Sequence, residues 1–133
     1  MYNHILVPMA LDHGYGPQAM ELAQKLRNDG GQITALHVYE KPQGMVTAYV
    51  DAGVVDQGFA AASEKLAARV ADQSNTQAQT IMRTFIDFAA EMWVDCIIMG
   101  SHKPGLIDFL LGSTAARVVR HAPCAVHVLR LDV

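Results

Sequence analysis

Short apolar runs alternate with segments of helical periodicity along the chain, and this alternation constrains the fold more than any other feature. Five runs have the length of buried strands, at residues 3–8, 33–38, 78–82, 96–99 and 124–129. No segment of the chain alternates between polar and apolar residues in the way that is typical of an open antiparallel sheet. We therefore expect an α/β fold with a mostly parallel, doubly wound sheet and helices on both faces.

The first two helical segments follow the first two runs. One begins at Pro17, a residue suited to the first turn of a helix because its missing N–H is not needed there. It is expected to end at Gly30-Gly31. The next covers residues 54–73, with an apolar stripe of Phe59, Ala62, Leu66 and Val70.

Two shorter helices follow. Thr84 with Asp87 resembles a capping box, which opens a helix over residues 85–92. The last helix covers residues 113–121 and is stopped by Ala122-Pro123. The order β-α-β-α-β-α-β-α-β predicts one domain over residues 1–133.

Composition and charge argue against several classes of partner. The net charge is −3 and the isoelectric point is near 6.0, whereas a nucleic-acid-binding protein normally has a basic face. Lysine and arginine are scattered, so no membrane-binding patch is expected, and no apolar stretch approaches the ~20 residues that span a bilayer. The first residues lack a signal-peptide pattern. Cys96 and Cys124 are expected to be free thiols in a reducing cytoplasm.

The expected topology places a ligand at one edge of the sheet. Right-handed crossovers force the strand order to reverse somewhere. If the order is 3-2-1-4-5, the reversal lies between the first and fourth strands, and ligands bind there, outside the carboxyl ends of the strands. Residues 8–16 and 100–112 flank this predicted crevice.

The segment from Gly100 to Thr114 carries chemistry that suits phosphate. Gly100 allows close approach of the backbone to a ligand. Hydroxyl, imidazole and ammonium donors follow in the order Ser101, His102 and Lys103. Gly112-Ser113-Thr114 opens a helix, whose free N–H groups and dipole favour an anion. The same residues also have plain structural roles as strand ends and helix caps. The segment is neither a Walker A loop nor a dinucleotide fingerprint.

Three stretches resemble the universal stress protein family: Ile-Leu-Val-Pro at 5–8, Asp-Cys-Ile-Ile-Met-Gly-Ser-His at 95–102, and residues 110–124. The similarity is strongest over 95–130, and the Ser-His-Lys-Pro stretch resembles the Ser-His-Arg-Pro variant of one subgroup. The resemblance implies a five-stranded 3-2-1-4-5 fold and a homodimer or tetramer. In the family the last strand, here 124–129, often pairs across the dimer.

The resemblance also implies a stress-response protein that binds ATP, ADP or AMP, alone or with Mg²⁺. The family's ATP binders carry G-x2-G-x9-G-[ST], whose outer parts match Gly100, Gly112 and Ser113; Lys103 stands in place of the second glycine, and the loop is one residue shorter. Val38 occupies the position from which relatives contact adenine through the backbone. The predicted binding set is Pro8, Ala10, Val38, Gly100, Ser101, His102, Lys103, Gly112, Ser113 and Thr114.

Two departures weaken adenine specificity more than phosphate binding. Ala10 stands where the ATP binders usually have an aspartate that contacts adenosine, although Asp12 is nearby. Residues 82–84 lack the glycine-bearing loop that normally follows the third strand. A dimeric interaction protein of the same fold that binds no nucleotide therefore stays open as an alternative.

Catalytic and metal-binding hypotheses find less support. The six histidines show no i, i+4 spacing, so no metal site is expected. Ser101, His102 and Lys103 lie together, yet no G-x-S-x-G elbow is present. We assign no catalytic residue and expect at most slow ATP hydrolysis. A receiver-type phosphoacceptor domain is disfavoured by Ala10 and Met82.

Overall fold

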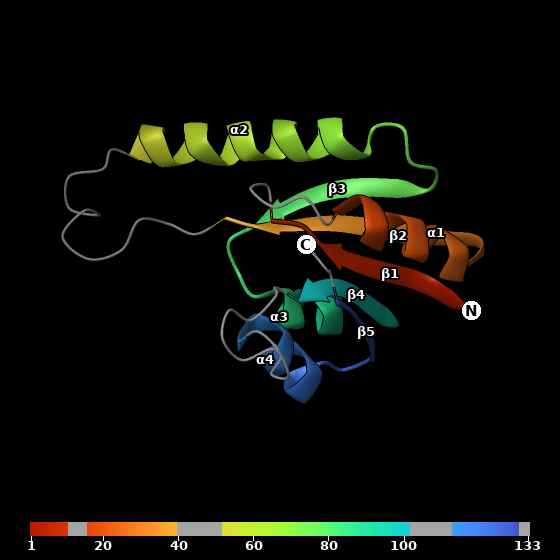
Figure 1. The fold of residues 1–133 in the computed structure, drawn as a ribbon. Helices are drawn as coiled ribbons and strands as arrows, with labels where there is room; N and C mark the ends of the chain where they lie inside the picture. The colour runs from red at the N-terminus through yellow and green to blue at the C-terminus, as the bar shows by residue number, and fades with distance from the viewer. Residues whose placement is uncertain (11–15, 40–51, 102–112, 131–133) are drawn as a thin grey trace.

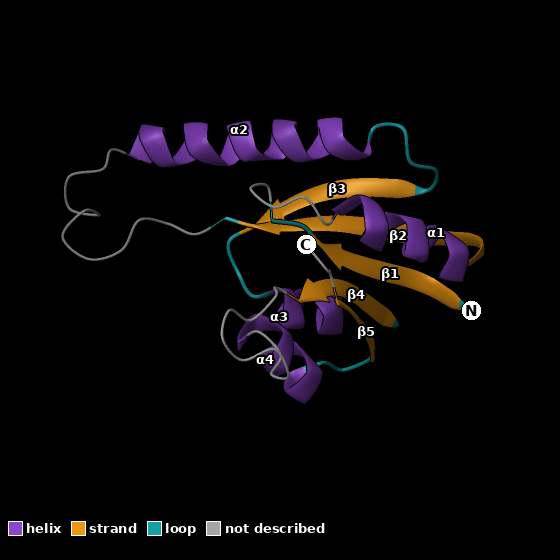
Figure 2. Ribbon diagram, viewed as in Figure 1, coloured by secondary structure: helices purple, strands orange, loops and turns teal. Residues whose placement is uncertain are grey.

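The computed structural model describes residues 1–10, 16–39, 52–101 and 113–130. Its five strands form one sheet in the order β3-β2-β1-β4-β5, and every neighbouring pair is parallel. Helices lie on both faces of this sheet (Figures 1 and 2). The predicted fold class and strand order are therefore confirmed.

The strands and helices alternate along the chain as expected. The strands are β1 (Tyr2–Pro8), β2 (Arg27–Val38), β3 (Thr76–Ile81), β4 (Cys96–Ser101) and β5 (Ala125–Arg130). The helices are α1 (Gly16–Leu26), α2 (Ala52–Val70), α3 (Phe85–Glu91) and α4 (Ser113–His121). The bounds of α4 are those predicted. The capping role of Thr84 is also confirmed, because its hydroxyl accepts from the backbone N–H of Asp87 at 3.3 Å.

The predicted end of the first helix is wrong. Helix α1 ends at Leu26, and Gly30-Gly31 lie inside β2. The pairing of β1 with β2 shifts register there, from Tyr2 opposite Arg27 to His4 opposite Gln32. Gly30 has a φ of 78°, and a Cβ at Gly31 would lie 3.0 Å from the carbonyl oxygen of Asn28. Both glycines are therefore suited to this register shift, where a positive φ and a close backbone contact disfavour a Cβ. The end of a helix places the same requirement on the backbone.

Side chains alternate between the two faces of the sheet and form two cores. On the α1–α2 face, Ile5, Ile33 and Ile98 are fully buried. On the α3–α4 face, Leu6 and Ile97 pack with Phe88 and Val118, among others. All six residues of β4 are buried, which explains why that run reads as apolar without alternation.

Candidate functional site

The order of the strands reverses between β1 and β4, as predicted. These two strands pair through Ile5–Cys96 and Leu6–Ile97, whereas β4 pairs with β5 over six positions up to Ser101–Arg130. Beyond Leu6 and Ile97, β1 and β4 are neighbours that no longer pair. The carboxyl ends of β1 and β4 lie next to the point where their pairing stops. This is the switch point at which open α/β sheets bind ligands.

The structure places half of the predicted binding set at this edge. Pro8 ends β1, Ala10 follows it, and Val38 ends β2; all three are partly buried. Gly100 and Ser101 are both buried, with Ser101 only 2% exposed. They belong to β4 and pair with β5, so the strand runs two residues further than the predicted end at Met99.

The remaining predicted residues are only partly described. His102, Lys103 and Gly112 lie outside the described residues. Ser113 is the first residue of α4, and Thr114 is exposed in its first turn. The phosphate-binding role of this segment stays a prediction.

The backbone that follows β1 is held by one backbone and two side-chain hydrogen bonds that the sequence did not indicate. The N–H of Met9 donates to the carbonyl of Leu36 at 2.7 Å. The carbonyl of Met9 accepts from Nδ1 of His37 at 3.1 Å, and that of Ala10 accepts from Arg69 of α2 at 3.4 Å. These partners are 28 and 59 residues away, so no local pattern could reveal them. They fix the entry into the switch-point segment.

The two cysteines are free, and they lie away from this edge. Cys96 begins β4 and Cys124 directly precedes β5, so both are near the amino ends of their strands. Burial raises the pKa of Cys96 to about 12 and also raises that of Cys124. Both thiols are therefore protonated at neutral pH and are weak nucleophiles.

Two classes of feature are missing from the described part of the chain. Within residues 1–10, 16–39, 52–101 and 113–130, no three His, Cys, Asp or Glu side chains gather in a way that could bind a metal ion. Within the same ranges, no helix has the length and apolar character needed to cross a bilayer.

The fold and the position of the site define an open, doubly wound α/β protein with its candidate ligand site at the β1–β4 switch point. The chain matches the sequence profile of the universal stress protein family over residues 1–130, and it belongs to this family. Universal stress protein A homolog 2 of Coxiella burnetii is 32% identical, over 98% of this chain and 96% of that protein.

Solved structures share the fold at lower identity. The hypothetical protein MJ0577 superposes with a TM-score of 0.77 at 20% identity, over 100% of this chain and 99% of that one. The universal stress protein of Archaeoglobus fulgidus in complex with dAMP gives 0.62 at 18% identity, over 96% and 97% of the two chains. A universal stress protein in complex with cAMP gives 0.59 at 18% identity, over 96% of each chain.

Proposed function

We propose that this protein is a stress-response protein that binds ATP or a related nucleotide between the segments that follow β1 and β4. The observation that carries the proposal is the end of β1–β4 pairing at Leu6 and Ile97, because the predicted phosphate-binding segment begins just beyond it. Solved structures of universal stress proteins with this fold in complex with dAMP and with cAMP support it. Pro8, Ala10 and Val38 would lie toward the nucleoside, and residues 100–103 and 112–114 toward the phosphates.

Titration calorimetry with ATP, ADP and AMP, each with and without Mg²⁺, tests the proposal. Binding of at least one of these nucleotides is expected, and no binding of any of them would overturn it. Thr114→Val removes a hydroxyl from the first turn of α4 and should weaken binding about three- to tenfold, in line with the loss of one hydrogen bond. Val119→Ala, on an exposed position of the same helix, should leave affinity unchanged.

The proposal includes a cytoplasmic homodimer or tetramer. Strand β5 is an edge of the sheet, since the strand order ends with it, and its residues are mostly half-buried. An edge strand offers backbone groups to a second chain. Analytical ultracentrifugation should show a dimer or tetramer at micromolar concentration, and a monomer throughout would refute this part.

A second candidate is an interaction protein of the same fold that binds no nucleotide. Two observations favour it: Ala10 carries no carboxylate, and only residues 82–84 connect β3 to α3. If the protein has this second function, its oligomerisation and its cellular effect should survive substitution of Lys103 or Ser113. Their loss in such variants would count against it. We propose no catalytic role for either candidate.

A further inference from the structure

The end of α3 carries the single tryptophan of the chain in a backbone conformation that is costly for this residue type. Trp93 has a φ of 56°, in the left-handed region that bulky side chains rarely adopt. The N–H of Val94 donates to the carbonyl of Ala89 at 3.1 Å, which is the closing bond of a Schellman motif. The residue at the place of Trp93 in this motif is usually glycine, so tryptophan does not serve the helix end itself.

Trp93 also contributes little to the core of its own chain. It is 88% exposed, whereas the next residue, Val94, is buried. Met92 before it is 42% exposed and Val119 on α4 is 50% exposed, so apolar side chains lie open at both helices. Backbone strain is retained mainly at functional positions, and tryptophan is enriched among the residues that dominate protein–protein interfaces. Trp93 therefore has the properties of an interface anchor.

Helices α3 and α4 lie side by side and carry opposite charges. Both cover the same face of the sheet, where Phe88 of α3 and Val118 of α4 belong to one core (Figure 1). Residues 84–95 contain aspartate and glutamate but no lysine or arginine, and residues 113–130 contain arginine but no acidic side chain. The two helices thus present an acidic strip beside a basic strip.

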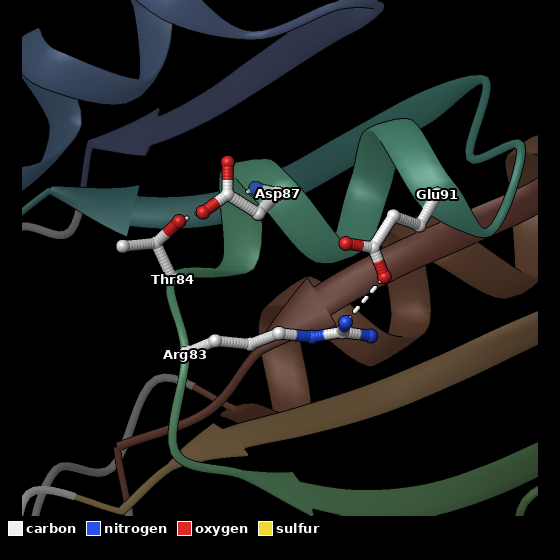
Figure 3. A network of polar contacts seen from close by, with 4 residues as sticks. All are labelled: Arg83, Thr84, Asp87 and Glu91. Atoms are coloured by element: carbon white, nitrogen blue, oxygen red, sulfur yellow. Dashed lines mark hydrogen bonds and ion pairs between the residues drawn. The ribbon is translucent and has the colours of Figure 1, made fainter.

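Several of these charges are available to a second molecule. Asp87 on α3 and Arg117 and Arg120 on α4 are exposed, and they make no ion pair within the part of the chain that the structure describes. Glu91, in contrast, is paired with Arg83 (Figure 3). A partner for this surface must offer a cation to α3 and an anion to α4, and a second copy of the same surface offers both.

We propose that the α3–α4 surface, formed by Asp87, Trp93, Arg117, Val119 and Arg120, is an interface between two copies of this chain. Both helices run from the carboxyl edge of the sheet to its amino edge, because each joins two parallel strands. A two-fold axis along the helices places α3 of each copy on α4 of the other, start against start and end against end. Asp87 then faces Arg117 of the second copy, and Trp93 packs on Val119 and Arg120.

The chemistry of this contact is complementary for both charge and apolar area. Each acidic strip meets a basic strip, and an arginine on the face of a tryptophan is a favourable cation–π pair. Two buried tryptophans remove about 300–500 Å² from water, a substantial part of the ~1,600 Å² of a standard interface. The contact is separate from the edge strand β5 considered above, and two different two-fold contacts on one chain build a tetramer from dimers.

The fluorescence of Trp93 reports on this interface, because the chain has no other tryptophan. Quenching by acrylamide, which is uncharged, measures its accessibility in the full chain at a concentration at which sedimentation shows the oligomer. Arg117→Glu places like charges together and should weaken association about tenfold or more. The quenching constant of the wild-type protein should then be about threefold lower than that of Arg117→Glu, since an interface anchor is shielded from solvent.

Lys65→Glu is the matched control for Arg117→Glu. It makes the same change of charge at an exposed position of α2, which packs on the other face of the sheet. Its quenching constant and its sedimentation should equal those of the wild-type protein. Thermal unfolding monitored by circular dichroism checks that each variant is folded.

A charge exchange tests the pairing of the two helices. Asp87→Lys and Arg117→Glu should each weaken association about tenfold, because each places two like charges together. The double variant should recover most of this loss, because the two charges have exchanged places. A double variant as weak as the two losses combined would contradict the contact between Asp87 and Arg117.

Trp93→Gly separates a role in the interface from a role within the chain. Glycine suits the left-handed backbone, so the urea midpoint of unfolding, measured at high dilution, should rise. Association should weaken about tenfold or more, because the apolar anchor is lost. A lower urea midpoint would show that Trp93 stabilises its own chain and would overturn the proposal.

The outcomes distinguish this contact from pairing through β5. If Trp93 is quenched equally in the wild-type and Arg117→Glu proteins, no second copy buries the α3–α4 surface and the inference is overturned. A wild-type dimer whose Trp93 is quenched as strongly as free tryptophan would leave β5 as its interface and the α3–α4 surface to a different protein. In Arg117→Glu, pairing through β5 should persist as a dimer in which Trp93 is accessible.

Discussion

Nε2 of His4 lies 2.8 Å from the hydroxyl oxygen of Thr34, a side chain that is fully buried in β2. Nδ1 of the same ring lies 3.0 Å from the carbonyl oxygen of Met92, an atom that only accepts, so Nδ1 carries the proton. In the neutral ring Nε2 therefore accepts from Thr34. The amide of Gln77 also donates to Thr34, at 3.4 Å, so this network joins β1, β2 and β3 to the end of α3.

Thr34→Val is expected to lower the free energy of unfolding by about 1–2 kcal/mol, because it keeps the shape of the side chain but leaves His4 and Gln77 without their buried partner. Thr80→Val is the matched control. The hydroxyl of Thr80 is buried and has no hydrogen-bond partner among the described residues, so this change should be neutral or stabilising. Urea unfolding measures both values. A larger loss for Thr80→Val than for Thr34→Val would contradict the network.

Asp95 joins the start of β4 to β1 through its carboxylate, which accepts from the backbone N–H groups of Asn3 at 2.8 Å and His4 at 3.0 Å. Asp95→Asn keeps one acceptor oxygen and replaces the other by a donor that faces an N–H group. We expect a loss of about 1–3 kcal/mol in the free energy of unfolding. Asp72→Asn, at an exposed site, should change it by less than about 0.5 kcal/mol. Equal effects of the two substitutions would refute the role of Asp95.

Stability should fall at alkaline pH because of Cys96. Burial raises the pKa of its thiol from 9.0 to about 12, so the unfolded chain releases this proton at lower pH than the folded protein does. The contribution of Cys96 is complete below about pH 8 and is lost as the pH rises from 9 toward 12. The raised pKa values of Tyr2 and Cys124 act in the same direction.

The Cys96→Ala variant isolates this effect. Between pH 8 and 10.5 it should lose less free energy of unfolding than the wild type does, whatever its absolute stability. Urea titrations at four or five pH values give both slopes. Parallel slopes for the two proteins would show that the thiol does not titrate as described.

His37 is expected to affect ligand binding through the backbone that it holds. His37→Ala removes the donor to the carbonyl of Met9 and should lower the free energy of unfolding by about 1 kcal/mol. If the segment after β1 contacts nucleotide, affinity should also fall about three- to tenfold. His127→Ala removes the same side chain from β5, where it packs edge-to-face on Tyr2, and should leave affinity unchanged. Equal affinity of the His37→Ala variant and the wild type would argue against a ligand at this segment.

Local signals explain which boundaries could be predicted from the sequence. The last helix was predicted to the residue because Pro123 follows its last turn, and the third was found through the Thr84 cap. The start of β2 was missed by six residues, since Gly30-Gly31 satisfy the backbone demands of a helix end and of a strand irregularity equally well. Only the pairing with β1, which is distant in sequence, distinguishes the two.

The sequence by itself determined the class of fold and the edge of the sheet where a ligand would bind. Alternating helices and buried strands require a parallel sheet, and right-handed crossovers then require a reversal of strand order. The tertiary structure alone decided which side chains meet near that edge. The hydrogen bonds of His37 to Met9 and of Arg69 to Ala10 join residues from separate elements, and Phe59 of α2 lines the same hollow as Met82. Such contacts depend on the packing of helices against the sheet, and no local spacing encodes them.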